Sequence, residues 1–320
     1  MGNKKMNIVF STTKQWNPGD ELILTGIRNL LGDHTYIMYN RHPHILNNAG
    51  KLYEKSGRVG DNSWYLGMGD ELVDHVIFAG SPEYHDIPNS DLYALIDAKD
   101  TPFSYIGVGG PPLSPRPYEK ASVCFTRDRL AATMPNAILA PCPSIFAVKD
   151  LNIKPRVNKE KIAFCFQSGL KYICSPNEDV HQASIKFINE YKPTVCCHSF
   201  PDYVEAVSRG WDPFYSARME DYFDFYSEFD VVVGTRIHGA GWAANYGIPS
   251  ITIHHDNRIE AAAFFGSIIT QASLLDKAFE DLNVPLASKY IIDLRKSWLG
   301  QYREKLEPIF GVAEGWDERT

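Results

Sequence analysis

The stretch that most constrains the fold runs from residue 229 to residue 256 and reads FDVVVGTRIHGAGWAANYGIPSITIHHD. Two short apolar runs, residues 231–233 and 250–253, enclose a turn and a segment rich in glycine and alanine. Continuous apolar runs of this length are typical of strands in a parallel sheet that is covered on both faces. The small residues between the runs predict a short helix over residues 239–245. The stretch therefore predicts a βαβ unit.

The turn of this unit carries Thr235, Arg236 and His238. In such a unit the carboxyl end of the strand and the first free amides of the helix face the same crevice, which favours an anion there. Arginine binds phosphate or carboxylate through two parallel hydrogen bonds, and histidine can carry a proton near neutral pH. We therefore expect an anion site at this turn, with further contacts from the amides of Gly239 and Ala240.

The charged residues of the turn also have a purely structural interpretation. His238 can be a histidine that only satisfies hydrogen bonds at the strand end, and Arg236 can pair with Glu228 or Asp230 on the surface. Their position at a strand end favours the functional interpretation. After the next strand, residues 254–256 read His-His-Asp, but adjacent residues on a strand point in opposite directions. We expect a loop that lines the cleft there, rather than a metal cluster.

Apolar runs alternate with helical segments along the rest of the chain. Further strands are expected at residues 6–11, 35–39, 76–79, 102–108, 123–126, 137–140, 162–167 and 194–197. Helices are expected at residues 21–31, 178–191, 202–208 and 219–228. The polar, aperiodic segment 149–161 is typical of a linker. We therefore predict an α/β fold of two Rossmann-like domains that face one cleft, residues 1–150 and 151–320, with a last helix over 288–310 that packs back on the first domain.

Several loops of the first domain are expected to face the same cleft. Asn17, Gly19 and Asp20 form a turn in which Asp20 is predicted to cap the first helix. Two later strands end in Gly/Pro loops, where glycine permits close approach of a ligand to the backbone. A further strand is expected to enter a helix at Arg127-Asp128. The candidate substrate contacts of this domain are Asn17, Gly19, Asp20, Gly80, Ser81, Glu83, Gly109 and Arg127.

The composition excludes some classes of function. A hydrophobic share of 44% with 22% charged residues is typical of a globular protein, and no apolar run approaches the roughly 20 residues that cross a bilayer. The net charge of −7 argues against general nucleic-acid binding, which rests on basic surfaces. The six cysteines lack the spacing of a disulfide framework, so we expect a reducing, cytoplasmic location. No CxxC pair occurs, and we expect no metal.

Five segments of the chain, in the order in which the family has them, resemble the polysaccharide pyruvyl transferase family. They are NPGDELILTGI at residues 17–27, the strand-end loops near Gly80 and Gly109, FTRDRLA at 125–131 and VVVGTRIHGAGWAANYGIPSITI at 231–253. The resemblance spans most of the chain, and its first and last segments are the most specific. It implies a fold like that of the GT-B glycosyltransferases. His238 and Arg236 match the family's R-x-H turn, and Arg127 matches its R-D pair.

The resemblance also implies a reaction. The family transfers a group from phosphoenolpyruvate to two hydroxyls of a sugar, which gives a pyruvate ketal and releases phosphate. It implies phosphoenolpyruvate as donor, no other cofactor, and a nucleotide- or lipid-linked sugar of a cell-surface or exported glycan as acceptor. His238 is then expected to be the general acid, and Arg236 and Arg127 to bind the phosphate or carboxylate. The acceptor sugar and the oligomeric state are left open.

Two departures from the family pattern keep other functions open. Ala79-Gly80-Ser81-Pro82 stands where many members have three glycines, and Cys142-Pro143-Ser144 stands where many have Asp-Pro-Ala. One alternative is a sugar-nucleotide glycosyltransferase of the same architecture, since a fold does not fix a chemistry. The other is a catalytically silent relative that binds glycans.

Overall fold

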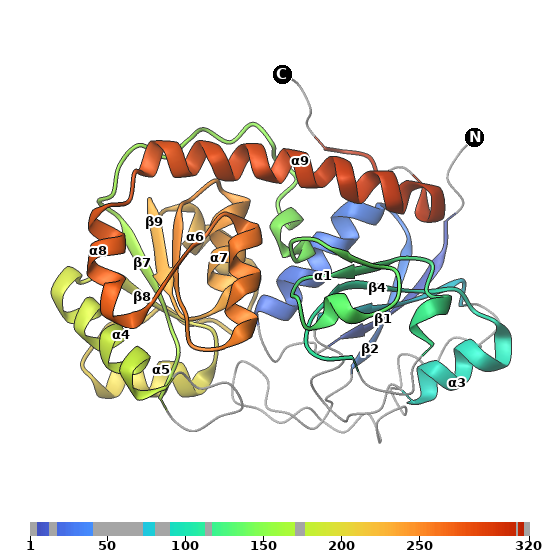
Figure 1. Ribbon diagram of the computed structural model, residues 1–320, viewed down its shortest axis with the longest axis horizontal. Coiled ribbons are helices and arrows are strands. Elements are labelled where there is room, and N and C mark those ends of the chain that lie inside the picture. Colours follow the sequence, from blue (N-terminus) through green and yellow to red (C-terminus); the bar gives the residue numbers. More distant parts are fainter. Residues whose placement is uncertain are drawn as a thin grey trace.

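Two parallel sheets stand side by side, and one long C-terminal helix lies across both (Figure 1). The computed structural model describes residues 5–12, 18–40, 73–80, 90–112, 117–169, 177–311 and 313–316. The first sheet has the strand order β2-β1-β3-β4-β5-β6, and the second has the order β11-β10-β9-β7-β8. Neighbouring strands are parallel in both sheets.

The first sheet is covered on both faces. Its strands are β1 (Asn7–Thr12), β2 (Thr35–Asn40), β3 (His75–Ala79), β4 (Phe103–Val108), β5 (Cys124–Thr126) and β6 (Ala137–Leu139). Every residue of β3 and β4 is buried, as expected of parallel strands between two layers. Helix α1 (Pro18–Leu31) places Ile23, Ile27 and Leu30 in one core of this half. Helix α3 (Ser90–Lys99) packs into the other core through Leu92, Leu95 and Ile96.

The second sheet follows the same plan with shorter strands. They are β7 (Ile162–Phe166), β8 (Thr194–Cys197), β9 (Val231–Gly234), β10 (Ser250–Ile253) and β11 (Ile268–Thr270). The helices are α4 (Glu178–Tyr191), α5 (Phe200–Ser208), α6 (Glu220–Ser227), α7 (Ile237–Asn245) and α8 (Leu275–Glu280), with a 3-10 helix, η6, over Asn257–Phe265. β9, α7 and β10 form the βαβ unit that the sequence predicts.

Helix α9 (Val284–Phe310) packs on both halves. Its amino-terminal part lies beside the second sheet, where Gly247 leaves room for Ile292. Its carboxyl-terminal part enters the core of the first half through Leu299, Tyr302, Leu306 and Phe310. The Tyr302 hydroxyl donates to the carbonyl oxygen of Pro141 at 2.7 Å. One helix thus completes the packing of both sheets.

Residues 144–150, which leave the first sheet, are held by side chains from two helices. Asn245 on α7 is fully buried; its Nδ2 donates to Ser144 O at 2.7 Å, and its Oδ1 accepts from Val148 N at 2.9 Å. Arg295 on α9 is 2% exposed and donates to the carbonyl oxygens of Ile145, Val148 and Asp150. Because buried amide and guanidinium groups are costly without partners, these bonds fix the path of the chain between the halves.

The predicted α/β fold of two parallel sheets is confirmed, but three local predictions are wrong. Helix α1 begins at Pro18 because proline suits the first helical position, so Asp20 lies inside the first turn and is not the N-cap. Arg127-Asp128 does not open an α-helix; a turn leads to the 3-10 helix η4 (Ala131–Thr133). Helix α7 begins at Ile237, before its predicted start. Within the described ranges, no helix has both the length and the apolar character needed to cross a bilayer.

A buried histidine in the first sheet makes the stability of the fold depend on pH. His75 is 1% exposed, its Nε2 lies 2.9 Å from Ser104 Oγ, and burial lowers its pKa from 6.5 to about 3. Between these two values the unfolded chain binds a proton that the folded chain does not. Above pH 6.5, His75 therefore adds no pH dependence to the free energy of unfolding. Below pH 6.5 its proton linkage lowers this free energy by about 1.4 kcal/mol per pH unit.

We expect His75→Gln to flatten this pH dependence by about 1 kcal/mol per unit between about pH 6 and 4, measured by urea unfolding. Ser104→Ala is the matched control, because it removes the hydrogen bond and keeps the histidine. It is expected to lower stability and to keep the wild-type slope. A His75→Gln protein with an unchanged slope would show that other groups cause the dependence.

Candidate functional site

Small residues hold α7 close to the second sheet. Arg236 is the N-cap residue of this helix, with φ −102° and ψ 129°. A Cβ at Gly239 would lie 2.9 Å from the Cβ of Cys165 on β7, so glycine permits this close approach. On the next turn, the buried ring of Trp242 stacks on Tyr226 with centroids 5.5 Å apart. The turn before α7 is thereby fixed at the carboxyl edge of the sheet.

His238 reaches from α7 to the first half of the molecule. Its ring lies against Gly19 at the start of α1, and a Cβ at position 19 would overlap Nδ1 and Cγ of the imidazole. The other ring nitrogen, Nε2, lies 3.5 Å from Arg127 Nη1. Gly19 and Arg127 belong to the first half and His238 to the second. The imidazole therefore stands where the two halves meet.

Two strand-end loops support Arg127. The residue follows β5 and is 6% exposed. Gly109, which follows β4, leaves room for it, because a Cβ there would lie 2.7 Å from Arg127 Nε. The Asp128 carboxylate accepts from Gly110 N and from Ala131 N, each at 2.9 Å. These bonds join the loops after β4 and β5 into one support for the guanidinium.

Arg236 extends in the other direction, towards α5. Its Nη2 donates to Asp202 Oδ2 at 2.5 Å and lies 3.5 Å from Ser199 Oγ. Asp202 is 1% exposed, and its Oδ1 accepts from Ser168 N, just after β7, at 2.9 Å. The alternative that pairs Arg236 with Glu228 or Asp230 is wrong, because α5 starts at the carboxyl edge of the neighbouring β8 and brings Asp202 to the guanidinium.

Burial and the positive charges of the site lower the pKa values of its imidazoles. Burial, together with the guanidiniums of Arg127 and Arg236, lowers the pKa of His238 from 6.5 to about 3. Burial and the charge of Arg236 also hold the pKa of His198, which follows β8, well below its usual range. His238 is therefore neutral near pH 7 in these surroundings, which differs from the expectation that it carries a proton. A negative charge bound beside it would raise this pKa.

The other predicted residues of the second half differ in whether their polar groups already have hydrogen-bond partners. Thr235 is 1% exposed, and within the described ranges its Oγ1 has no hydrogen-bond partner; the same holds for Arg236 Nε. The Gly239 amide donates to Arg236 O at 3.0 Å, and Ala240 packs into the core. The cause is the earlier start of α7, which makes Ile237 its first residue.

In the first half, Gly80 and Gly109 meet where β3 and β4 end, and Gly109 N donates to Gly80 O at 3.1 Å. Gly80 has φ 80°, a conformation that glycine adopts without strain. Asp20 lies in the first turn of α1, next to Gly19. Asn17, Ser81 and Glu83 fall outside the described residues.

Sequence reasoning missed Asp202 and Ser168. Ser168 comes shortly after β7, and Asp202 lies in the first turn of the helix that follows β8. Their position after strands was the available signal, because the carboxyl ends of all strands in a parallel sheet share one edge. In the part of the chain that the structure describes, no three His, Cys, Asp or Glu side chains group as metal ligands.

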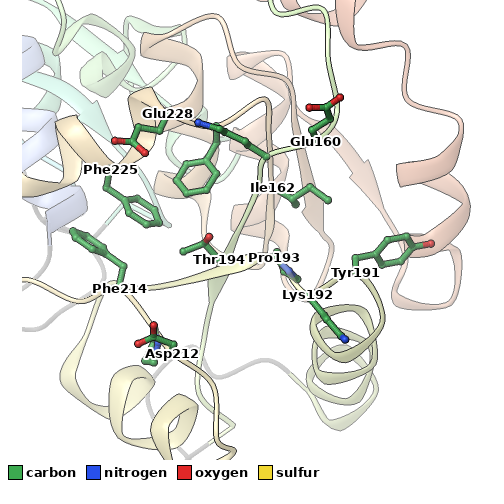
Figure 2. A pocket seen from close by; sticks show the side chains of 13 residues that line it. Glu160, Ile162, Tyr191, Lys192, Pro193, Thr194, Asp212, Phe214, Phe225 and Glu228 are labelled. Carbon is green, nitrogen blue, oxygen red and sulfur yellow. The ribbon is translucent and has the colours of Figure 1, made fainter.

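A groove of about 680 Å³ lies elsewhere on the second half (Figure 2). It is lined by Ile162 and Thr194, where β7 and β8 begin, and by Phe214, Phe225 and Glu228. This is the amino edge of the sheet, opposite to the edge that carries Arg236. The groove is therefore separate from the cluster of Arg127, His238 and Arg236.

Comparison with solved structures shows the architecture of the chain. Anabaena HepE in complex with UDP-glucose gives a TM-score of 0.56 at 11% identity, over 95% of this chain and 98% of that one. S. aureus MnaA with UDP gives 0.54 at 14%, over 98% and 100%. The UDP-GlcNAc 2-epimerase of Methanocaldococcus jannaschii with UDP-GlcNAc and UDP gives 0.50 at 11%, over 92% and 100%. The fold is thus of the GT-B type.

The comparison with curated proteins finds no match. A family model described as polysaccharide pyruvyl transferase matches residues 17–257. The matched range begins beside Gly19 and includes Arg127, the turn of Arg236 and His238, and the strands from β2 to β10. It covers more than half of the chain. The chain therefore belongs to the polysaccharide pyruvyl transferase family.

Proposed function

We propose that this chain transfers a pyruvyl group from phosphoenolpyruvate to two hydroxyls of a sugar in a cell-surface or exported glycan. One observation carries the proposal: Arg127, His238 and Arg236 gather at the meeting of the two halves, in a chain of this family. Phosphoenolpyruvate carries a phosphate and a carboxylate, and guanidinium groups bind both. With one arginine from each half, one guanidinium is available for the phosphate and one for the carboxylate.

The proposed reaction balances without a further reactant. One hydroxyl of the sugar adds to C2 of phosphoenolpyruvate and loses its proton, which balances the proton delivered to C3, where a methyl group forms. The second hydroxyl then replaces the phosphate at C2, and its proton leaves with the phosphate. The products are a cyclic ketal and inorganic phosphate. The site must bind two anions, hold a proton near C3 and stabilise positive charge at C2.

His238 is our candidate for the proton transfer to C3. Its pKa of about 3 is set by burial and by Arg127 and Arg236, and two bound anions would cancel the effect of both guanidiniums. We propose that His238 takes up its proton together with phosphoenolpyruvate and then acts as the general acid. The proton is thus available only when the donor is in place, which limits loss of phosphoenolpyruvate to water.

A sugar-nucleotide glycosyltransferase is the second candidate. The similar structures named above hold UDP, UDP-glucose or UDP-GlcNAc, and a diphosphate can bind between the same arginines. In the preferred proposal a nucleotide- or lipid-linked sugar is the acceptor. Thermal shift measurements with phosphoenolpyruvate and with a panel of UDP-sugars separate the two. Stabilisation by UDP-sugars without any effect of phosphoenolpyruvate would favour the glycosyltransferase.

The direct test is incubation with phosphoenolpyruvate and a panel of nucleotide- and lipid-linked sugars. We expect the mass gain of a pyruvate ketal on one acceptor, with release of one phosphate for each ketal. We expect His238→Asn to lower kcat by about 100-fold or more, because it removes the proton donor and keeps a polar side chain of similar width. Near wild-type phosphate release by this variant would remove His238 from the mechanism.

Gly19→Ala tests the contact that places His238. The new methyl group overlaps the imidazole, so we expect the ring to move and kcat to fall by about tenfold or more. Gly300→Ala is the matched control, since Gly300 lies inside α9 and a Cβ there meets no heavy atom within 4 Å. This control is expected to keep full activity and to gain up to about 1 kcal/mol of stability from helix propensity. Equal activities of the two variants would show that the position of the ring is unimportant.

The titration of His238 can be followed directly by NMR of its ring, with His238→Asn for assignment. Without ligand we expect a neutral ring down to about pH 4. With saturating phosphoenolpyruvate we expect the pKa to rise by more than about one unit. Because binding then takes up a proton, affinity should fall as the pH rises through the new value. A ring already protonated at pH 6 without ligand would contradict this account.

A further inference from the structure

Asp202 joins two loops at the carboxyl edge of the second sheet. One carboxylate oxygen, Oδ2, accepts from Arg236 Nη2 at 2.5 Å, and the other, Oδ1, accepts from Ser168 N at 2.9 Å. Ser168 follows β7, and Arg236 follows β9, its neighbour in the sheet. Asp202 is 1% exposed, whereas the side chain of Arg236 is 20% exposed. The carboxylate is thus buried, whereas the side chain of Arg236 is partly open to solvent.

A second carboxylate on the same helix holds the loop after β7 without touching Arg236. Glu205 Oε2 accepts from Ser168 Oγ at 2.7 Å and from Gly169 N at 2.9 Å. Its Oε1 accepts from Arg209 Nη2 at 2.7 Å. The loop is therefore held by two carboxylates, and Arg236 by one. This difference makes it possible to loosen the loop and the guanidinium separately.

The structure assigns to Asp202 the role of a positioning residue for the anion site: it holds the Arg236 guanidinium in the orientation that binds the phosphate or carboxylate of the donor. The proposal rests on the function proposed above. Nη2 is turned to Asp202, and Nε, on the same edge of the guanidinium, has no partner among the described residues. An anion is therefore offered a guanidinium whose rotation is already restricted, so less entropy is lost on binding.

A positioning role and a purely electrostatic role of Asp202 predict opposite changes in anion affinity when its charge is removed. If Asp202 served only to neutralise a buried arginine, removal of its charge would leave the site more positive and tighten anion binding. If Asp202 positions Arg236, removal of its charge frees the guanidinium and weakens anion binding. Loss of stability is expected in both cases, because a buried ion pair is broken, and it does not discriminate between them.

The test uses calorimetric binding of inorganic phosphate and of phosphoenolpyruvate to the full chain, which needs no acceptor sugar. We expect Asp202→Asn to raise the Kd of both by about tenfold or more, the usual effect of losing a hydrogen bond to a charged group. In the transfer assay we expect KM for phosphoenolpyruvate to rise by a similar factor, with kcat changed less. Wild-type or tighter phosphate binding by Asp202→Asn would overturn the proposal.

Two further variants make the test specific. Glu205→Gln loosens the loop after β7 and keeps the Asp202–Arg236 pair, so we expect phosphate binding close to wild type. Equal weakening by Glu205→Gln and Asp202→Asn would overturn the proposal in favour of the loop. Asp202→Glu keeps the charge, and with it a partner for Arg236, but moves the carboxylate by one methylene. We expect it to weaken phosphate binding as well; full affinity in this variant would contradict the positioning role even if Asp202→Asn fails to fold.

The failures of the two proposals are distinguishable. A wild-type chain that binds neither phosphate nor phosphoenolpyruvate overturns the proposed function, and the positioning role with it. A wild-type chain that binds both, beside an Asp202→Asn variant that binds equally well, overturns the positioning role alone.

Discussion

The contact between Gly19 and His238 fixes how the two halves of the molecule come together. No side chain larger than a hydrogen atom fits between the start of α1 and the imidazole, so the first half must approach α7 at this point. The approach is supported nearby by Asn245, which bonds to Ser144 and Val148 across the junction. The result is a buried imidazole beside Arg127, whose pKa is lowered by burial and by the charges of Arg127 and Arg236.

In each half, a buried aspartate orders the loops around the arginine of that half. In the first half, the buried Asp128 binds backbone amides of the loops beside Arg127. In the second half, the buried Asp202 binds the Ser168 amide and Arg236 itself. A buried carboxylate demands several donors, and strand-end amides supply them. The loops of each sheet are therefore ordered around a negative charge before any anion arrives.

The sequence predicts those parts of the fold and site that depend on neighbours along the chain. The apolar runs of β9 and β10 and the small residues of α7 identify the βαβ unit, and its turn identifies Arg236 and His238. Contacts between distant segments were not accessible in this way. Glu228 and Asp230 were the acidic residues close to Arg236 in sequence, but the partner is Asp202, which the parallel sheet brings to the same edge. Likewise, no pattern near Gly19 in the sequence indicates that the imidazole of His238 lies against it and requires glycine there.

Helix α9 has a consequence for the order in which the chain is assembled. The core of the first half contains Leu299, Tyr302, Leu306 and Phe310 of α9, which follow the strands of both sheets, β1 to β11, in the chain. During translation the first sheet is therefore exposed along the surface that these side chains later cover, while the second half emerges from the ribosome. Folding of the first half is completed only when α9 packs against it, so the two halves reach their final form together rather than one after the other.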